Sequence, residues 1–232
     1  LLARFLVQTS EFTELFERYQ PSLLFATDVY TPQDVKLMRM SERRGVKIVG
    51  MVRSWDNITS KTLLVFAPEH LVVNTKWIKE EAVRYGDVSS ESIFITGVPH
   101  YDSYRAEGRK PRKDFFNQFD FDPTKKLILF TPPSDNYLKH DPVTPVVLRA
   151  LEATGAQLLV RRALVGAIDL GDYRSPPSVA FDEPGTSPDF TKVYLSRAAD
   201  QHLADSIYHS DLVVTWASTM IIDAAVFLRP IL

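Results

Sequence analysis

The chain has 232 residues, of which 45% are hydrophobic and 11% aromatic, and its formal net charge is −2. This length allows one large domain or two of ordinary size, and the apolar fraction suffices to build real cores. The near-neutral charge, without a long run of one sign, excludes the basic surface typical of nucleic-acid-binding proteins. The sequence contains no cysteine, which excludes disulfides, cysteine-ligated metals and a thiol nucleophile.

The same features bear on location. No apolar run reaches the roughly 18 residues that a membrane span needs. The opening LLARFLVQ has neither an initiator methionine nor the layout of a signal peptide. With the lack of cysteine, this favours a reducing, cytoplasmic compartment. Because the chain also ends at Leu232 part-way into an apparent strand, we expect a piece cut from a longer protein at both ends.

In the first half of the chain, apolar runs alternate with helical patterns, which is typical of an α/β protein with parallel sheets. The run 22–26 (SLLFA) predicts a buried strand, and the following helix has Thr31 as N-cap and Gly45 as its stop. A later helix is expected to stop at Gly86. Strands are expected at 22–26, 47–52, 71–73 and 92–96, and helices at 12–19, 31–44 and 75–85.

The second half repeats this alternation. Between the halves, residues 103–125 are polar, carry both charge signs and include Gly and Pro, which is typical of a linker with one short helix near 112–119. We therefore predict two Rossmann-like parallel-sheet domains, 1–105 and 126–232, joined by a linker at 106–125, each of them incomplete. Strands are expected at 126–130, 157–160, 178–181 and 212–214, and helices at 143–154, 199–209 and 220–227.

The last segment, SDLVVTWASTMIIDAAVFLRPIL, is the most informative. Its strand ends in polar residues, and Ser218 and Thr219 then open a helix. At the carboxyl end of a parallel strand, such a turn offers backbone N–H groups and hydroxyls to an anion, usually phosphate. Asp223 follows one helical turn later and is expected to face the same ligand. The alternative is an ordinary helix cap followed by a surface aspartate.

This segment resembles the nucleotide-binding part of GT-B glycosyltransferases and their relatives. The relatives include bacterial UDP-N-acetylglucosamine 2-epimerases and CDP-glycerol glycerophosphotransferases. The resemblance implies that Ser218 and Thr219 hold the diphosphate of a nucleotide-activated donor and that Asp223 holds a ribose or sugar hydroxyl. It also implies a GT-B fold of two Rossmann-like halves, with the donor acting as substrate and no separate cofactor.

A second dense group of functional side chains follows the strand 47–52, in the loop RSWDNITSK. Trp55 offers a flat face on which a sugar or base can stack, and Asp56 and Asn57 offer hydroxyl ligands. SWDNITSK resembles a segment of bacterial glycosyltransferase-like proteins close to the CDP-glycerol transferase group. We expect this loop and Asp28 to contact the acceptor, with Asp56 as the base. The alternative is an Asx turn with Trp55 packed against the domain.

Three further candidates come from other strand ends. The sequence GVPHYD at 97–102 resembles the end of the first GT-B domain, where His100 is a candidate base or an ordinary loop residue. Arg161 matches the arginine of an R-x-H-P pattern and is expected to neutralise a diphosphate, although this chain lacks the His and Pro. Thr131 and Ser134 begin the first loop of the second half, where the donor is expected to approach.

Metal chemistry is not indicated, because the histidines are scattered and none pairs with another ligand at helical or hairpin spacing. The sequence also lacks P-loop, dinucleotide-binding and nucleophile-elbow motifs. The resulting hypothesis is a metal-independent GT-B transferase, which moves a sugar or polyol phosphate from a nucleotide-activated donor to a surface-polymer or lipid-linked precursor. A lipid-linked acceptor would bring the protein to the inner face of the membrane.

Two rival hypotheses use the same fold. One is an epimerase-like enzyme acting on the nucleotide sugar itself. The other is a non-catalytic binding module, which the missing His-Pro after Arg161 favours. The sequence leaves the nucleotide, the sugar and the acceptor open.

Overall fold

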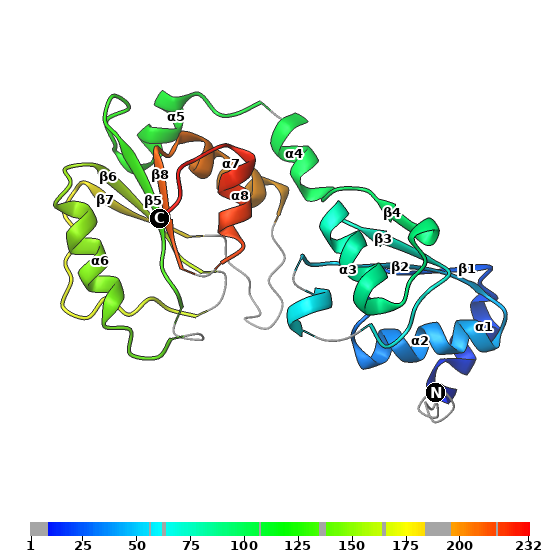
Figure 1. Ribbon diagram of the computed structural model, residues 1–232. Helices are drawn as coiled ribbons and strands as arrows, with labels where there is room; N and C mark the ends of the chain where they lie inside the picture. The colour runs from blue at the N-terminus through cyan, green and yellow to red at the C-terminus, as the bar shows by residue number, and fades with distance from the viewer. Residues whose placement is uncertain are drawn as a thin grey trace. The chain divides into compact units, whose positions relative to one another are not determined.

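The computed structural model describes residues 9–55, 57–61, 64–106, 108–134, 138–163, 166–183, 196–216 and 218–232. The chain forms two compact units, Leu1–Pro99 and His100–Leu232 (Figure 1). Each unit contains one four-stranded sheet whose described pairings are all parallel. The predicted architecture of two Rossmann-like parallel-sheet halves is therefore confirmed. No helix in the described ranges is long and apolar enough to cross a membrane.

The first sheet has its strands in chain order, β1-β2-β3-β4. Two of its helices begin with a threonine cap. The hydroxyl of Thr31 accepts a hydrogen bond from the amide of Asp34 at 3.1 Å, and that of Thr75 accepts one from the amide of Ile78 at 3.2 Å. The elements are a 3₁₀ turn (Ser10–Phe12), α1 (Thr13–Tyr19), β1 (Leu23–Ala26), α2 (Pro32–Arg43), β2 (Lys47–Met51), a π-helix (Asn57–Lys61), β3 (His70–Val73), α3 (Lys76–Gly86), a 3₁₀ turn (Ser90–Ser92) and β4 (Ile93–Ile95).

Only one face of this sheet is packed by the described helices. Ile48, Leu71 and Ile93 point to that face and form one core with side chains of α2 and α3. Leu23 and Phe25 of β1 point the other way and are each 52% exposed. The strand predicted as buried is thus buried on one side only, since its neighbours in the described part of the chain leave the second side open.

A close approach explains the glycine in the middle of β2. A Cβ built at Gly50 would lie 2.6 Å from Cγ1 of Val29 and 2.8 Å from Cγ of Pro68. Such distances are well inside van der Waals contact, so a larger residue would push the loop after β1 or the segment before β3 away from the sheet. Gly50 therefore lets the loop that follows β1 and the segment that precedes β3 pack tightly against the sheet.

The second sheet has the order β7-β6-β5-β8, so the chain moves outward from β5 to β7 and then returns to the other side of β5. Beyond β8, Ile231 forms an isolated parallel bridge with Val213. The elements are α4 (His100–Ala106), α5 (Arg112–Phe116), a 3₁₀ turn (Asn117–Phe119), β5 (Leu127–Thr131), α6 (Val143–Glu152), β6 (Gln157–Arg161), β7 (Val179–Asp182), α7 (Arg197–His209), β8 (Leu212–Thr215) and α8 (Met220–Val226).

Both faces of the second sheet are packed. Leu127 and Leu129 of β5 join one core with residues of α5, α7 and α8, while Ile128 and Phe130 join another with residues of α6. Figure 1 shows the same layers, with α6 on one side of the sheet and α7 and α8 on the other. The continuous apolar run of β5 therefore indicates a strand covered on both faces, as in other parallel sheets.

The segment predicted as a linker is structured and belongs to the second unit. The division of the chain falls at Pro99, before the expected linker at 106–125. Arg112 anchors this segment by donating to the carbonyls of Pro123, Lys125 and His209 at 2.9, 2.9 and 2.7 Å. Because one guanidinium satisfies three backbone acceptors, a stretch with polar composition becomes part of the domain.

Candidate functional site

The reversal of strand order in the second sheet falls between β5 and β8. In open α/β sheets, a crevice forms outside the carboxyl ends of the two strands where the order reverses, and ligands bind there. Thr131 is the last residue of β5 and Thr215 is the last residue of β8, and the two are paired in register. Their Oγ1 atoms are 2.6 Å apart and hydrogen-bonded. Two hydroxyls thus mark the edge at which a ligand is expected.

The turn after β8 contributes further polar groups to this edge. Ser218 and Thr219 are both exposed and directly precede α8. The amide of Met220 donates to Oγ of Ser218 at 3.2 Å, whereas the side chain of Thr219 makes no capping hydrogen bond. The structure places these residues where the sequence predicts them, at the start of a helix at the strand end. Phosphate binding by the turn stays a prediction.

A hollow of about 400 Å³ lies at the carboxyl end of β8, where Thr215 and Trp216 line it. Its walls are mainly apolar side chains of α6, with Thr215 and Trp216 from β8 and the residue after it. Asp141 closes one end and caps α6 by accepting the amides of Val143 and Thr144 at 2.8 and 3.2 Å. Burial raises the pKa of the Asp141 carboxyl, but these bonds and the Thr144 hydroxyl outweigh it and hold the pKa below its usual value. The site therefore combines an apolar recess with hydroxyls and an ionised carboxylate.

Asp223 does not point freely towards this edge. It is 8% exposed, and the hydroxyl of Tyr104 donates to its Oδ1 at 3.1 Å. Burial raises the pKa of Asp223, while the Tyr104 hydrogen bond and the nearby His100 partly oppose the rise. The expectation that Asp223 faces the donor therefore requires that Tyr104 first release it. Tyr104 is a residue that sequence reasoning missed.

His100 belongs to the same network. Its Nε2 lies 3.2 Å from the Tyr104 hydroxyl and 3.5 Å from Oδ1 of Asp200. Burial, followed by the charges of Asp223 and Asp200, raises the pKa of Tyr104, so the tyrosine keeps its proton and donates it. Sequence reasoning gave His100 and Asp223 separate roles, as base and as donor ligand. The structure joins them through one tyrosine on α4.

Arg161 is also engaged inside the unit. It is 4% exposed at the end of β6, and its Nη1 forms an ion pair with Oδ2 of Asp182. The other oxygen of Asp182 lies 2.9 Å from Nε2 of His202. A buried arginine whose charge is balanced by a carboxylate is not presented to a diphosphate. The geometry thus argues against the donor-binding role expected for Arg161.

Ser134, on the loop after β5, is placed differently. It is 1% exposed, and its Oγ has no hydrogen-bond partner among the described residues. A buried hydroxyl without a partner is costly unless a ligand or water satisfies it. This loop therefore remains compatible with a ligand at the end of β5.

In the first unit, the expected acceptor residues lie at the carboxyl end of the sheet. Asp28 follows β1 and is 8% exposed; it accepts the amide of Tyr30 at 3.1 Å and lies 3.3 Å from Nη2 of Arg53. Trp55 follows β2 and is 56% exposed, so it is not packed into the domain. Asp56, the residue expected to act as base, lies outside the described residues.

Asn57 and Asn74 add buried amides to the same edge. Both side-chain oxygens are buried and have no partner among the described residues. Nδ2 of Asn74 donates to the carbonyl of Arg53 at 3.4 Å, which links the ends of β2 and β3. Arg53 belongs to the loop RSWDNITSK but was given no role of its own, and Asn74 was not singled out because it directly follows an apolar run outside that loop. Their adjacency depends on the register of β2 and β3.

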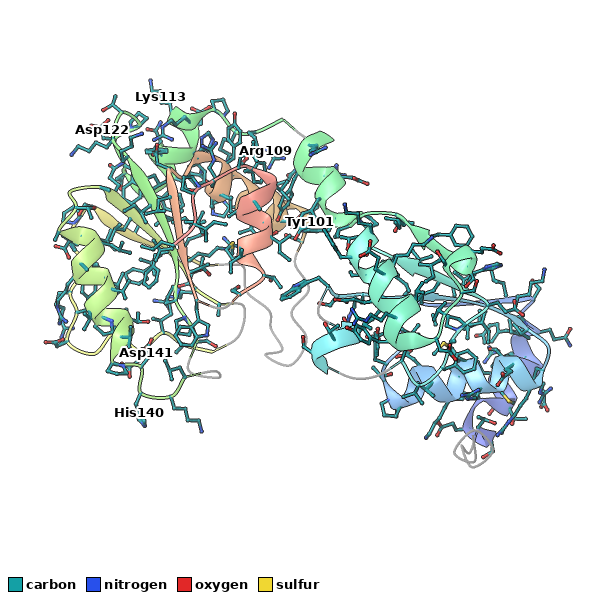
Figure 2. All side chains as sticks on the ribbon, in the orientation of Figure 1. Tyr101, Arg109, Lys113, Asp122, His140 and Asp141 are labelled. Carbon is teal, nitrogen blue, oxygen red and sulfur yellow. The ribbon has the colours of Figure 1, made fainter. Side chains whose placement is uncertain are left out.

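No group of three or more His, Asp or Glu side chains in the described ranges is arranged to hold a metal ion. Figure 2 shows Asp141 and Asp122 towards opposite ends of the second unit. The hydroxyl-rich strand ends described above lie at the Asp141 end.

No protein-family model and no curated protein matches this sequence. Solved structures do match in fold. The UDP-GlcNAc 2-epimerase from Methanocaldococcus jannaschii matches with a TM-score of 0.60 at 13% identity, over 96% of this chain and 64% of that one. The epimerase from Neisseria meningitidis bound to UDP-GlcNAc matches with a TM-score of 0.58 at 12% identity, over 97% and 62%.

A glycosyltransferase from Rickettsia africae matches with a TM-score of 0.50 at 9% identity, over 96% of this chain and 60% of that one. At such identities the likeness concerns the fold alone. It shows that the chain shares the GT-B fold of these structures, and the fold that the sequence resemblance implies is confirmed. The chain spans less than two thirds of the length of these structures.

Proposed function

We propose that this chain is part of a GT-B enzyme that acts on a nucleotide-activated sugar or polyol, with the donor held by the second unit. The observation that carries this proposal is the strand reversal between β5 and β8, which brings the hydroxyls of Thr131 and Thr215 together at 2.6 Å. The diphosphate would bind there and at the turn of Ser218 and Thr219. Hydroxyl side chains and backbone amides at the start of a helix can donate hydrogen bonds to a leaving diphosphate and stabilise it without requiring a metal.

In the proposed reaction, the donor's sugar or polyol phosphate passes to a surface-polysaccharide or glycolipid precursor. The first unit would present that acceptor through Asp28, Trp55 and Asn57. The support for this half of the proposal is that the same edge of the sheet carries the exposed indole of Trp55 and two buried asparagine oxygens that lack partners in the described residues. Sugars bind in this way, with a ring face on an aromatic side chain and hydroxyls on amides.

An epimerase-like reaction is the second candidate. The observation that favours it is that the epimerase folds match with higher TM-scores than the glycosyltransferase, 0.60 against 0.50. An epimerase would bind the same donor in the second unit but would need no acceptor. The two candidates thus share the donor site and differ in what the donor becomes.

The first test is a thermal-shift panel of UDP-, CDP- and GDP-linked sugars and CDP-glycerol on the full-length protein. A ligand at 100 times its dissociation constant stabilises a protein by about 2.7 kcal/mol. We expect one nucleotide class to raise the melting temperature and the double variant Thr131→Val with Thr215→Val to abolish most of the shift. Thr96, at the end of the first sheet, supplies the control Thr96→Val, which should respond like the wild type.

Mass spectrometry together with proton nuclear magnetic resonance of the products then separates the reactions, because the second method distinguishes epimers of equal mass. Transfer predicts that the donor is consumed only with an acceptor, and epimerisation predicts a product of unchanged mass without one. A donor that binds but is never consumed would indicate a binding module. Binding that is unchanged in the Thr131→Val, Thr215→Val variant would contradict the proposed site itself.

A further inference from the structure

A second cavity, of about 540 Å³, lies in the second unit. It is lined by the segment Arg109–Arg112, by the end of α7 with the turn into β8, and by Arg229 after α8. These segments are far apart in the sequence, so the cavity depends on the folded unit. Sequence reasoning assigned no role to any of these residues.

The cavity lies at the opposite edge of the sheet from the proposed donor site. Asp211, in its wall, directly precedes β8, whereas Thr215 ends that strand. A strand of this length spans roughly 13 Å. In Figure 2, Arg109 lies towards the end of the second unit that also carries Lys113 and Asp122, away from Asp141 and His140. A ligand here would not contact the hydroxyls of Thr131 and Thr215.

The walls are strongly cationic, although the chain as a whole carries a net charge of −2. The lining contains Arg109, Lys110, Arg112 and Arg229, with Asp211 as its carboxylate. His209 adds no charge near neutral pH, because burial lowers its pKa. Four positive side chains in one concave surface raise the local concentration of anions.

Part of this charge has a structural role. Arg112 is committed to three carbonyls and lies 3.6 Å from Asp211, which also binds Lys126 at 2.8 Å. Arg109 lies 3.5 Å from the carboxylate of Asp205. These contacts fix the floor of the cavity, and they leave two cations to be considered.

Lys110 and Arg229 have no carboxylate partner among the described residues. Nζ of Lys110 lies 3.3 Å from the neutral Oε1 of Gln118 and is exposed. The Arg229 guanidinium lies over the ring of Tyr208, 5.4 Å from its centroid, and its Nε has no hydrogen-bond partner in the described ranges. A guanidinium held against a ring keeps its N–H donors oriented, which suits a bidentate contact to phosphate.

We propose that this cavity is a second anion site, which binds a phosphoryl group through Arg229 and Lys110. Its ligand is distinct from the donor's diphosphate, because the two sites lie at opposite edges of the sheet. The phosphoryl group belongs either to a soluble phosphorylated molecule or to a phospholipid headgroup.

The test uses the arginine Nε–Hε signals in the nuclear magnetic resonance spectrum of the full-length protein, with inorganic pyrophosphate as the probe. The Arg229 signal is assigned from its loss in Arg229→Lys. We expect this signal to shift saturably as pyrophosphate is added. In Lys110→Gln, the same signal should report a dissociation constant raised by about fivefold, the upper range for one partly exposed ion pair.

A matched control comes from the first unit, where Arg84 lies over the ring of Tyr85 at 5.2 Å. Arg84→Gln should leave the pyrophosphate titration unchanged. An Arg229 signal that does not move, or a dissociation constant unaffected by Lys110→Gln, would overturn the proposal.

Vesicles distinguish the two sources of phosphate. One set contains phosphatidylcholine alone and the other adds phosphatidylglycerol. Co-sedimentation with the second set only, lost in the Lys110→Gln, Arg229→Gln double variant, assigns a lipid headgroup. Pyrophosphate binding without vesicle binding assigns a soluble ligand, and either result supports the site.

Discussion

The two sheets of this protein are built from similar parts and differ in two respects. The first keeps its strands in chain order and is packed on one face by the described helices, whereas the second reverses its order at β5 and is packed on both faces. The reversal brings two strand ends together with diverging loops, so a crevice can form there. Repeated βα units thus acquire a ligand site through the order of their strands and not through the number of units.

The difference in packing can be tested by truncating core side chains. Leu158 and Leu159 are neighbours on β6, point to opposite faces and are both 0% exposed. Each change to Ala should lower the free energy of unfolding by about 2–5 kcal/mol. In the first sheet, Leu71→Ala should have an effect of that size, but Phe25→Ala on the open face should cost less than about 1 kcal/mol.

Urea denaturation followed by tryptophan fluorescence separates the units, because Trp55 and Trp77 lie in the first and Trp216 in the second. If Phe25→Ala proved as damaging as Leu71→Ala, the first sheet would be packed on both faces in solution and the contrast would fail.

Buried carboxylates sharpen the comparison further. Asp28 in the first unit pairs with Arg53, whose side chain is 73% exposed, while Asp223 in the second accepts from Tyr104, which is 3% exposed. Tyr104→Phe would leave the Asp223 carboxylate without this donor and should destabilise the second unit by about 1–3 kcal/mol. Arg53→Gln should change stability by no more than about 1 kcal/mol, since its pair is solvent-screened.

The pH dependence follows from the raised pKa of Asp223. At pH values above 3.8, the usual pKa of this carboxyl, the folded protein holds a proton that the unfolded chain releases. Stability therefore falls as the pH rises through the folded pKa. Losing the Tyr104 hydrogen bond raises that pKa further. The decrease in the free energy of unfolding caused by Tyr104→Phe should therefore be larger at neutral pH than near pH 4. An equal decrease at both pH values would show that Tyr104 acts only by packing.

The hydroxyls at the turn before α8 provide a test of binding. Ser218→Ala with Thr219→Val keeps the backbone and removes both hydroxyls, so donor affinity should fall at least about tenfold, or about 1.4 kcal/mol. Ser196 gives a matched control, because its Oγ caps α7 by accepting the amide of Ala199 at 3.1 Å. Ser196→Ala should reduce stability yet leave the donor's dissociation constant, measured by calorimetry, unchanged. Unaltered affinity in the double variant would reduce this turn to a helix cap.

The smallest expected effect concerns histidine. His209 is 6% exposed, its Nε2 lies 2.7 Å from the Lys110 carbonyl, and burial lowers its pKa below the usual 6.5. Between the folded pKa and 6.5 the unfolded chain binds more protons, so this contribution to stability is complete above pH 6.5 and is lost as the pH falls. In urea denaturation, His209→Gln should reduce the decline in the free energy of unfolding between pH 7 and pH 5. His70→Gln, at an exposed position in the first sheet, should leave that decline unchanged.

Periodicity was a good guide to the elements of both units. The apolar run at 127–130 and the caps Thr31 and Gly45 are local signals, and each predicted feature is present. Gly86 is an exception, because the left-handed stop falls at Asp87, with φ of 54°. A Cβ at Gly86 would lie 3.1 Å from Cδ2 of Leu64, so this glycine serves packing.

The site was less predictable, because its residues meet through tertiary structure. Thr131 and Thr215 are adjacent only because β8 pairs with β5, and no local pattern shows that Tyr104 reaches Asp223 from α4. Arg161 illustrates the reverse error: a strand-end arginine suits a phosphate in sequence, but the register with β7 places Asp182 beside it. The short helix near 112–119 was expected, but the polar composition of 106–125 concealed that the segment belongs to the second unit, because Arg112 binds the carbonyl of His209, which is distant in sequence.

The most direct test of the central claim is a crystal structure of the full-length protein with the nucleotide-linked donor that the thermal-shift panel selects. We expect the diphosphate to lie at the carboxyl ends of β5 and β8, within hydrogen-bond distance of hydroxyls from Thr131, Thr215, Ser218 or Thr219. A donor bound only at the carboxyl end of the first sheet, beside Trp55 and Asn57, would contradict it.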